Sequence, residues 1–193
     1  PLENARISPL DHGFLVGDGV FETLRVYDGA PFAWRRHADR LRASAEGLGL
    51  AVPDCDRLRL VVDDVLAANG LRDARLRITV TSGVAPPGSS RRGSRGTTVV
   101  LVAVPIEPPA ATADVVIAPW TRNEHGALAG LKTISYAANA RALTYAESRR
   151  AVEAIFANTQ GNLCEATGSN VFCVLDGVLV TPPATAGCLL GVT

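Results

Sequence analysis

Residues 128–136 read Leu-Ala-Gly-Leu-Lys-Thr-Ile-Ser-Tyr, and Lys132 in this stretch is the single lysine among 193 residues. The other 18 cationic side chains are arginine. A primary amine can lose its proton and attack a carbonyl carbon, whereas a guanidinium stays charged. The stretch therefore indicates a catalytic amine around which the rest of the chain is arranged. The alternative is a lysine that survived drift toward arginine codons.

The composition is that of an ordinary globular protein, with 47% hydrophobic residues, 20% charged residues and zero formal net charge. Zero net charge argues against a general nucleic-acid binder, and no apolar run approaches the roughly 18 residues of a membrane span. The four cysteines lack C-x-x-C spacing, so we expect no metal site and no disulfide framework. We expect a cytoplasmic setting, and a chain that looks truncated at both Pro1 and Thr193.

The first half of the chain mixes strand and helix patterns after an irregular start through residue 19. Helical spacing predicts two helices, at residues 37–48 and 58–66, and Asn69-Gly70 suits the end of the second. Asp28-Gly29 is typical of a hairpin turn. Alternating apolar residues predict strands at residues 20–27, 31–34, 74–81 and 98–104.

The Pro-rich segment at residues 106–111 is typical of a linker, and we place a domain boundary there, with domains at 1–107 and 108–193. Lys132 is expected where a loop turns into a helix at residues 135–149. Runs of strands with interposed helices predict an α+β fold rather than a parallel βαβ array. The second half has strand patterns at residues 115–118, 151–157, 163–166, 170–175 and 178–181.

Two other motifs have simpler explanations. Gly17-Asp18-Gly19 could suggest a phosphate loop, but no strand precedes it and no helix follows it, so a turn is the better interpretation. Arg91, Arg92 and Arg95 lie in a Pro-, Gly- and Ser-rich stretch without interleaved aromatic residues, which favours a solvated loop over a nucleic-acid site. His125 and the cysteines are interpreted as structural.

A Schiff-base lysine needs partners, and its natural cofactor is pyridoxal phosphate, whose ring nitrogen requires a carboxylate. Glu165 is a candidate because it lies in a polar cluster within a strand-rich region; a surface-facing glutamate on an edge strand is the alternative. The phosphate needs a guanidinium or backbone N–H groups, and Arg40 or the turn at residues 191–193 could supply them.

Five separated motifs, in register from about residue 3 to the last residue, resemble class IV aminotransferases, the fold-type IV pyridoxal-phosphate enzymes. That family includes branched-chain aminotransferases, D-amino-acid aminotransferases and 4-amino-4-deoxychorismate lyase. The motifs are Gly17-Asp18-Gly19-Val20-Phe21-Glu22-Thr23-Leu24-Arg25, His37-x-x-Arg40-Leu41-x-x-Ser44-Ala45, Gly130-Leu131-Lys132-x-x-x-Tyr136, Glu165-x-x-x-Ser169-Asn170-x-Phe172, and Thr181-Pro182-Pro183 followed by Gly191-Val192-Thr193.

The resemblance implies a pyridoxal 5'-phosphate enzyme in which Lys132 forms the Schiff base and moves protons. It implies that Glu165 pairs with the pyridine nitrogen and that Tyr136 hydrogen-bonds near the phenolic oxygen of the cofactor.

The resemblance also implies that Arg40 binds the phosphate together with the backbone amides of Val192 and Thr193. It implies a small N-terminal α/β domain, a larger C-terminal domain and a homodimer, as in D-amino-acid aminotransferases, acting on a small amine or amino acid. The family normally has a further strand before Pro1 and about a third more chain after Thr193, including a second phosphate-contacting loop, and this sequence lacks both.

Within the family, three sequence differences favour 4-amino-4-deoxychorismate lyase over a transaminase. Ser82 stands where similar D-amino-acid enzymes have a carboxylate-binding arginine. Residues 133–135 replace the longer Gly-Gly-Asn segment of branched-chain enzymes, and residues 122–132 resemble the lyase approach to the lysine. Arg77 is the candidate for binding a substrate carboxylate, with an ordinary exposed strand arginine as the alternative.

Overall fold

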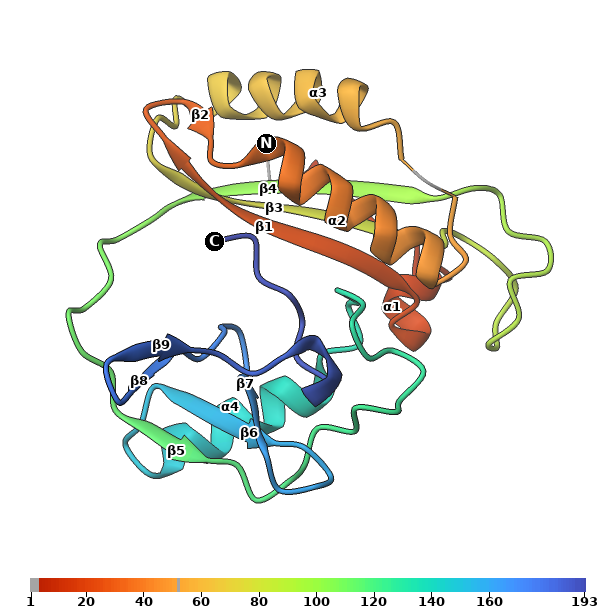
Figure 1. Ribbon diagram of the computed structural model, residues 1–193. Coiled ribbons are helices and arrows are strands. Elements are labelled where there is room, and N and C mark those ends of the chain that lie inside the picture. Colours follow the sequence, from red (N-terminus) through yellow and green to blue (C-terminus); the bar gives the residue numbers. More distant parts are fainter. Residues whose placement is uncertain (1–3, 52) are drawn as a thin grey trace. The chain divides into compact units, whose positions relative to one another are not determined.

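Two compact units make up the chain in the computed structural model, which describes residues 4–51 and 53–193 (Figure 1). The first unit runs to Glu107 and also includes Lys132–Ser135; the second contains Pro108–Leu131 and Tyr136–Thr193. Residue 3, where the family resemblance starts, lies outside the described residues. We propose that the two units correspond to the small domain and to part of the large domain of the family.

The first unit contains a four-stranded antiparallel sheet in the order β2-β1-β3-β4. Asp28 and Gly29, both at positive φ, close the β1–β2 hairpin as their sequence predicts. In register, Phe21 of β1 faces Thr79 of β3, which faces Val100 of β4. The strands are β1 (Gly19–Tyr27), β2 (Ala30–Pro31), β3 (Ala74–Thr81) and β4 (Thr98–Pro105).

Two helices, α2 (Trp34–Gly47) and α3 (Cys55–Ala68), cover one face of this sheet (Figure 1). Their apolar stripes pack on the residues of β1 and β3 that alternate toward them, and this forms the larger core. Asp54 caps α3 by accepting hydrogen bonds from two backbone N–H groups of its first turn. The fully buried members of the core include Leu24, Leu41, Val62, Leu76 and Ile78.

Two predictions for this unit were wrong in detail. Residues before β1 include a short helix, α1 (His12–Val16), where we predicted irregular structure. Five residues are too few to show a helical period, and capping by the Asp11 side chain defines this helix. The strand predicted at residues 31–34 is limited to Ala30–Pro31, because α2 already begins at Trp34, whose side chain packs against the core.

The second unit has a three-stranded sheet in which β6 (Glu153–Ala157) pairs parallel with β5 (Val115–Ile117) and antiparallel with β7 (Leu163–Ala166). Helix α4 (Ala137–Ser148) packs on β6. Its buried residues are Asn139, Ala142 and Ala146. A separate hairpin joins β8 (Cys173–Leu175) to β9 (Val178–Val180), and η2 (Ala184–Ala186) is a single 3-10 turn.

Across the described part of the chain, 4–51 and 53–193, no helix is both long enough and apolar enough to cross a membrane.

A buried carboxylate, Glu22, links β1 to α2. Its side chain is 1% exposed, and its two oxygens accept hydrogen bonds from Arg40 Nε and Arg40 Nη2, both at 2.7 Å. His37 Nδ1 lies 2.7 Å from Oε2. Burial alone would raise the pKa of Glu22, but the hydrogen bonds and charge of Arg40 and His37 outweigh it, so this pKa lies below its ordinary value. The carboxylate therefore stabilises the fold above that ordinary value, 4.5, and loses its contribution as pH falls through the lower folded value.

We expect Glu22→Gln to lower the free energy of unfolding at pH 7 by roughly 3 kcal/mol, since breaking a buried ion pair strands its partner. Urea unfolding measures this change. The matched control is Glu46→Gln, at an exposed position of α2, which we expect to change stability by less than about 0.5 kcal/mol. The difference between wild type and Glu22→Gln should shrink as pH falls below 4.5. Equal stability of the two variants at pH 7 would contradict the assigned role.

Candidate active site

Lys132 belongs to an extended segment that pairs with the start of β1. Phe21 N–H donates to Lys132 O at 2.9 Å, Ile134 N–H donates to Gly19 O at 2.9 Å, and Val20 and Thr133 form an antiparallel bridge. Lys132 N–H donates to Ser44 Oγ of α2 at 3.1 Å. We predicted that Lys132 lies where a loop turns into a helix, and this prediction was wrong. Helix α4 starts at Ala137, and Lys132 instead lies beside a strand whose edge groups need hydrogen-bond partners.

The Lys132 side chain lies over the aromatic ring of Phe21, with Nζ 4.6 Å from the ring centroid. The guanidinium carbon of Arg77 lies 3.7 Å from the same centroid. Phe21 and Arg77 are diagonal neighbours on the sheet face opposite the α2 and α3 core, because side chains alternate along each strand. Lys132 is the predicted nucleophile, and Arg77 is the candidate for binding a substrate carboxylate. Both side chains thus make cation–π contacts with the same aromatic ring.

Arg77 also lines a cavity of about 560 Å³ in the first unit. Thr79 and Thr81 of β3, Ile134 and Phe14 are among its other lining residues. Ser82, the position that argued against D-amino-acid enzymes, is buried next to Thr81. Arg77 is half-buried, so the ordinary exposed strand arginine that we considered does not describe it.

Arg40, predicted for the phosphate, reaches β1 from the α2 side through its pair with Glu22. Its side chain is 17% exposed. The paired carboxylate orients the guanidinium and keeps its plane in place, since a two-pronged contact is geometrically specific.

In the second unit, Glu165 of β7 is held by two donors. Arg122 Nη2 lies 3.2 Å from Oε1, and Leu189 N–H donates to Oε2 at 2.8 Å. Glu165 does lie on an edge strand, but its side chain is only 14% exposed and faces Arg122, which in turn lies over the Phe156 ring. A neighbouring guanidinium and a backbone N–H both favour an ionised carboxylate.

The remaining predicted cofactor residues also lie in the second unit. Tyr136 is half-buried and is the N-cap residue of α4. Val192 and Thr193 follow Gly191, where an added Cβ would lie 2.2 Å from Asn170 Oδ1, so that glycine permits close packing on Asn170. Thus Lys132, Arg40 and Arg77 belong to the first unit, and Tyr136, Glu165, Val192 and Thr193 to the second.

Cys164 and Cys188, close to Glu165, are buried thiols. Burial raises the pKa of Cys164 to about 12, and burial also raises the pKa of Cys188. Both therefore stay protonated and are poor nucleophiles, in agreement with a structural role. Across residues 4–51 and 53–193, no group of three or more His, Cys, Asp or Glu side chains could hold a metal ion.

Sequence reasoning missed three residues that contact predicted site residues, namely Phe21 and Ser44 in the first unit and Arg122 in the second. Phe21 and Ser44 belong to two of the five motifs, but no role was assigned to them from the sequence. Arg122 was considered only as part of residues 122–132, which lead up to Lys132. Arg122 pairs with a residue 43 positions later, and no local pattern reports such a pairing. Alternation along β1 could have placed Phe21 on the face opposite the core.

Comparison with known proteins agrees with these motifs. The sequence profile of the family described as amino-transferase class IV matches residues 19–193. A Methanocaldococcus jannaschii protein provisionally named branched-chain-amino-acid aminotransferase is 35% identical, with 99% of this chain and 68% of that protein covered. The aminodeoxychorismate lyase of Bacillus subtilis is 31% identical over 99% of this chain and 67% of its own length. A Staphylococcus epidermidis D-alanine aminotransferase is 30% identical over 99% and 68%.

Solved structures show the same relationship. The branched-chain aminotransferase of Thermoproteus uzoniensis, determined with norvaline, superposes with a TM-score of 0.91 at 30% identity, covering 99% of this chain and 67% of that one. A Mycobacterium tuberculosis aminotransferase in its pyridoxal-phosphate-bound form gives a TM-score of 0.84 at 28% identity, covering 97% and 69%. The α+β fold expected from the sequence is therefore confirmed as that of the fold-type IV enzymes, and this chain belongs to the class IV aminotransferase family.

Proposed function

We propose that this protein is a 4-amino-4-deoxychorismate lyase, which releases pyruvate from 4-amino-4-deoxychorismate and forms 4-aminobenzoate for folate synthesis. Its family membership makes it a pyridoxal 5'-phosphate-dependent enzyme. The observation that carries the proposal is the placement of Lys132 Nζ and the Arg77 guanidinium against the one Phe21 ring. A carboxylate bound by Arg77 would hold a substrate amine near the lysine.

The chemistry of the donor set fits the cofactor. Lys132 offers an amine for the aldehyde, Glu165 an ionised carboxylate for the pyridine nitrogen, and Arg40 a guanidinium for the phosphate. Tyr136, and the backbone amides of Val192 and Thr193, would complete this set. When bound, pyridoxal phosphate withdraws electrons from the substrate carbon that carries the amine.

Each of these residues has a separate role in the proposed reaction. Lys132 Nζ takes a proton from the substrate carbon that carries the amine and returns a proton later in the turnover. Glu165, which pairs with Arg122 and accepts a hydrogen bond from Leu189 N–H, would hold the protonated pyridine nitrogen of the cofactor. Arg77 binds a substrate carboxylate, and its contact with Phe21 restricts its rotation.

The choice of lyase rests on the approach to Lys132 at residues 122–132, on Ser82, and on the Bacillus subtilis relative. The second candidate is an amino-acid transaminase for branched-chain or D-amino acids. It is favoured by the 35% identity to the Methanocaldococcus jannaschii protein and by the D-alanine aminotransferase relative.

The proposal includes a homodimer in the cytoplasm. Cys55, Cys164, Cys173 and Cys188 are free thiols, which supports a reducing compartment.

Product analysis of the full-length protein with added pyridoxal phosphate separates the two candidates. We expect 4-aminobenzoate and pyruvate in equal amounts from 4-amino-4-deoxychorismate. We expect no glutamate from 2-oxoglutarate with L-leucine or D-alanine as donor. Glutamate formation without 4-aminobenzoate would instead establish the transaminase.

Lys132→Ala should reduce turnover by about 10²–10⁴-fold or more, because it removes the proton-transferring amine. In the wild type, borohydride should attach the cofactor to the peptide that contains Lys132, as mass spectrometry would show. Lys132→Arg is the matched control, since it keeps the charge without the nucleophile and should be equally inactive. Cofactor trapped on a different peptide would contradict the assignment.

Arg77→Gln should raise KM for the carboxylate substrate by about 10–100-fold, since a hydrogen bond to a charged group contributes roughly 1.5–3 kcal/mol. Steady-state kinetics measures the change. Arg75→Gln is the control, because Arg75 is the exposed arginine two residues earlier on the same face of β3. An equal effect of both variants would assign Arg77 a general electrostatic role instead of substrate binding.

A further inference from the structure

The Gly17-Asp18-Gly19 turn lies directly against the segment that carries Lys132. Ser135 Oγ donates to Gly17 O at 2.9 Å, and Ile134 N–H donates to Gly19 O. An added Cβ would lie 2.8 Å from Ser135 Oγ at Gly17, and 2.9 Å from Ile134 Cδ1 at Gly19. Gly17 also has a φ of 70°, which favours glycine. The two glycines therefore permit a close contact between the turn and residues 132–135.

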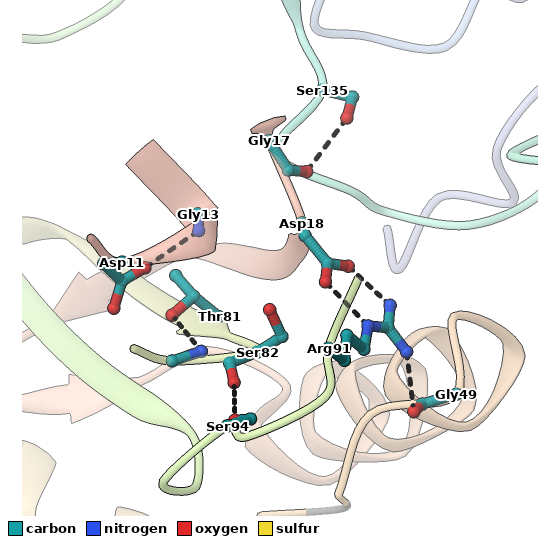
Figure 2. Close-up of polar contacts among 11 residues, drawn as sticks. Asp11, Gly13, Gly17, Asp18, Gly49, Thr81, Ser82, Arg91, Ser94 and Ser135 are labelled. Atoms are coloured by element: carbon teal, nitrogen blue, oxygen red, sulfur yellow. Dashed lines mark hydrogen bonds and ion pairs between the residues drawn. The ribbon is translucent and has the colours of Figure 1, made fainter. Parts of the chain in front are cut away.

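Asp18, between these glycines, points to the other side of the turn and pairs with Arg91 (Figure 2). Arg91 Nε donates to Asp18 Oδ2 at 2.7 Å, and Nη2 donates to Oδ1. The third nitrogen, Nη1, donates to Gly49 O at 2.9 Å, just beyond the end of α2. All three guanidinium nitrogens are thus used. The stretch is the exposed loop that we predicted, but Arg91 within it is paired, which the sequence did not show.

The backbone of Asp18 is held as well. Its N–H donates to His12 O at 3.2 Å, and its carbonyl accepts from Ser82 N–H at 3.0 Å. Burial alone would raise the pKa of the Asp18 carboxyl, but the hydrogen bonds and the positive charge of Arg91 outweigh it and keep this pKa below its ordinary value. The pair therefore stays charged at neutral pH.

The loop that supplies Arg91 is itself anchored. Ser94 Oγ donates to Ser82 O at 2.8 Å, as Figure 2 shows, and Arg95 N–H donates to Val84 O at 3.1 Å. His12 Nε2 contacts Pro86 O at 3.0 Å. Arg91 thus extends from a fixed loop to the turn and to the end of α2, the helix whose Ser44 holds Lys132 N–H.

We propose that Asp18 and Arg91 are positioning residues, which hold the Gly17–Gly19 turn so that its carbonyl groups set the position of residues 132–135 and hence of Lys132 Nζ. The inference rests on the proposed catalytic role of Lys132. The proposed reaction chemistry does not use this turn, and Arg91 reaches the turn from a separate loop.

Hydrogen exchange measured by mass spectrometry tests the positioning directly, in the full-length protein without added cofactor. In Asp18→Asn and in Arg91→Gln, the peptides that contain Phe21 and Ile134 should exchange faster than in the wild type. Arg95→Gln is the matched control, because it removes the same charge from an exposed position of the same loop. We expect the control to exchange at the wild-type rate.

Kinetics of the cofactor-loaded enzyme gives the second readout. Each single variant should lower kcat by about 10–100-fold through misplacement of the amine, with KM changed by less than about 2-fold. Borohydride trapping on the Lys132 peptide should slow in parallel. The double variant should lose no more than either single variant, since the two residues act as one unit.

The outcomes separate the two proposals. The inference is supported if both variants exchange faster and have a lower kcat, while Arg95→Gln shows neither change. Wild-type exchange and wild-type kcat, while cofactor is still trapped on Lys132, overturns the inference and leaves the proposed function intact. Cofactor trapped elsewhere in the wild type overturns the proposed function, whatever the exchange data show. A loss of melting temperature with unchanged kcat per folded, loaded protein would make the pair a stability element only and would overturn the inference.

Discussion

The backbone pairing between residues 132–134 and the start of β1 is the interaction on which the candidate site depends. It joins a segment far along the chain to the first strand of the sheet, and it uses edge groups of β1 that β2 does not reach. Strand geometry then decides which side chains share a face. Thr133 is buried with Val20, while Lys132 lies over the ring of Phe21.

Carboxylate–arginine pairs connect separate segments of the chain in both units. Arg40 pairs with Glu22, Arg91 with Asp18, and Arg122 with Glu165. A guanidinium suits these positions because it stays charged and offers several donors in one plane. We propose that the single lysine stands where the reaction needs a nucleophilic amine, which a permanently charged guanidinium cannot supply.

Local patterns predicted much of the fold correctly. The bounds of β3 and β7 were predicted to the residue, since alternation over residues 74–81 and the polar boundaries of residues 163–166 are strong local signals. The Asp28-Gly29 turn and the end of α3 near Asn69-Gly70 follow from the need for positive φ. In contrast, α1 was missed and α2 was predicted to start three residues late, because both depend on capping and packing contacts rather than on period.

The sequence by itself determined the family, and it predicts the reactive amine and the chemical types of its partner residues, because five ordered motifs and a single lysine are properties of the chain alone. Only the tertiary structure decided that Lys132 sits beside a strand instead of at a helix start, that Arg77 shares its aromatic ring, and that Arg91 holds the turn beside it. These are contacts between residues tens of positions apart. Their geometry depends on sheet register and on hydrogen bonds that no local pattern encodes.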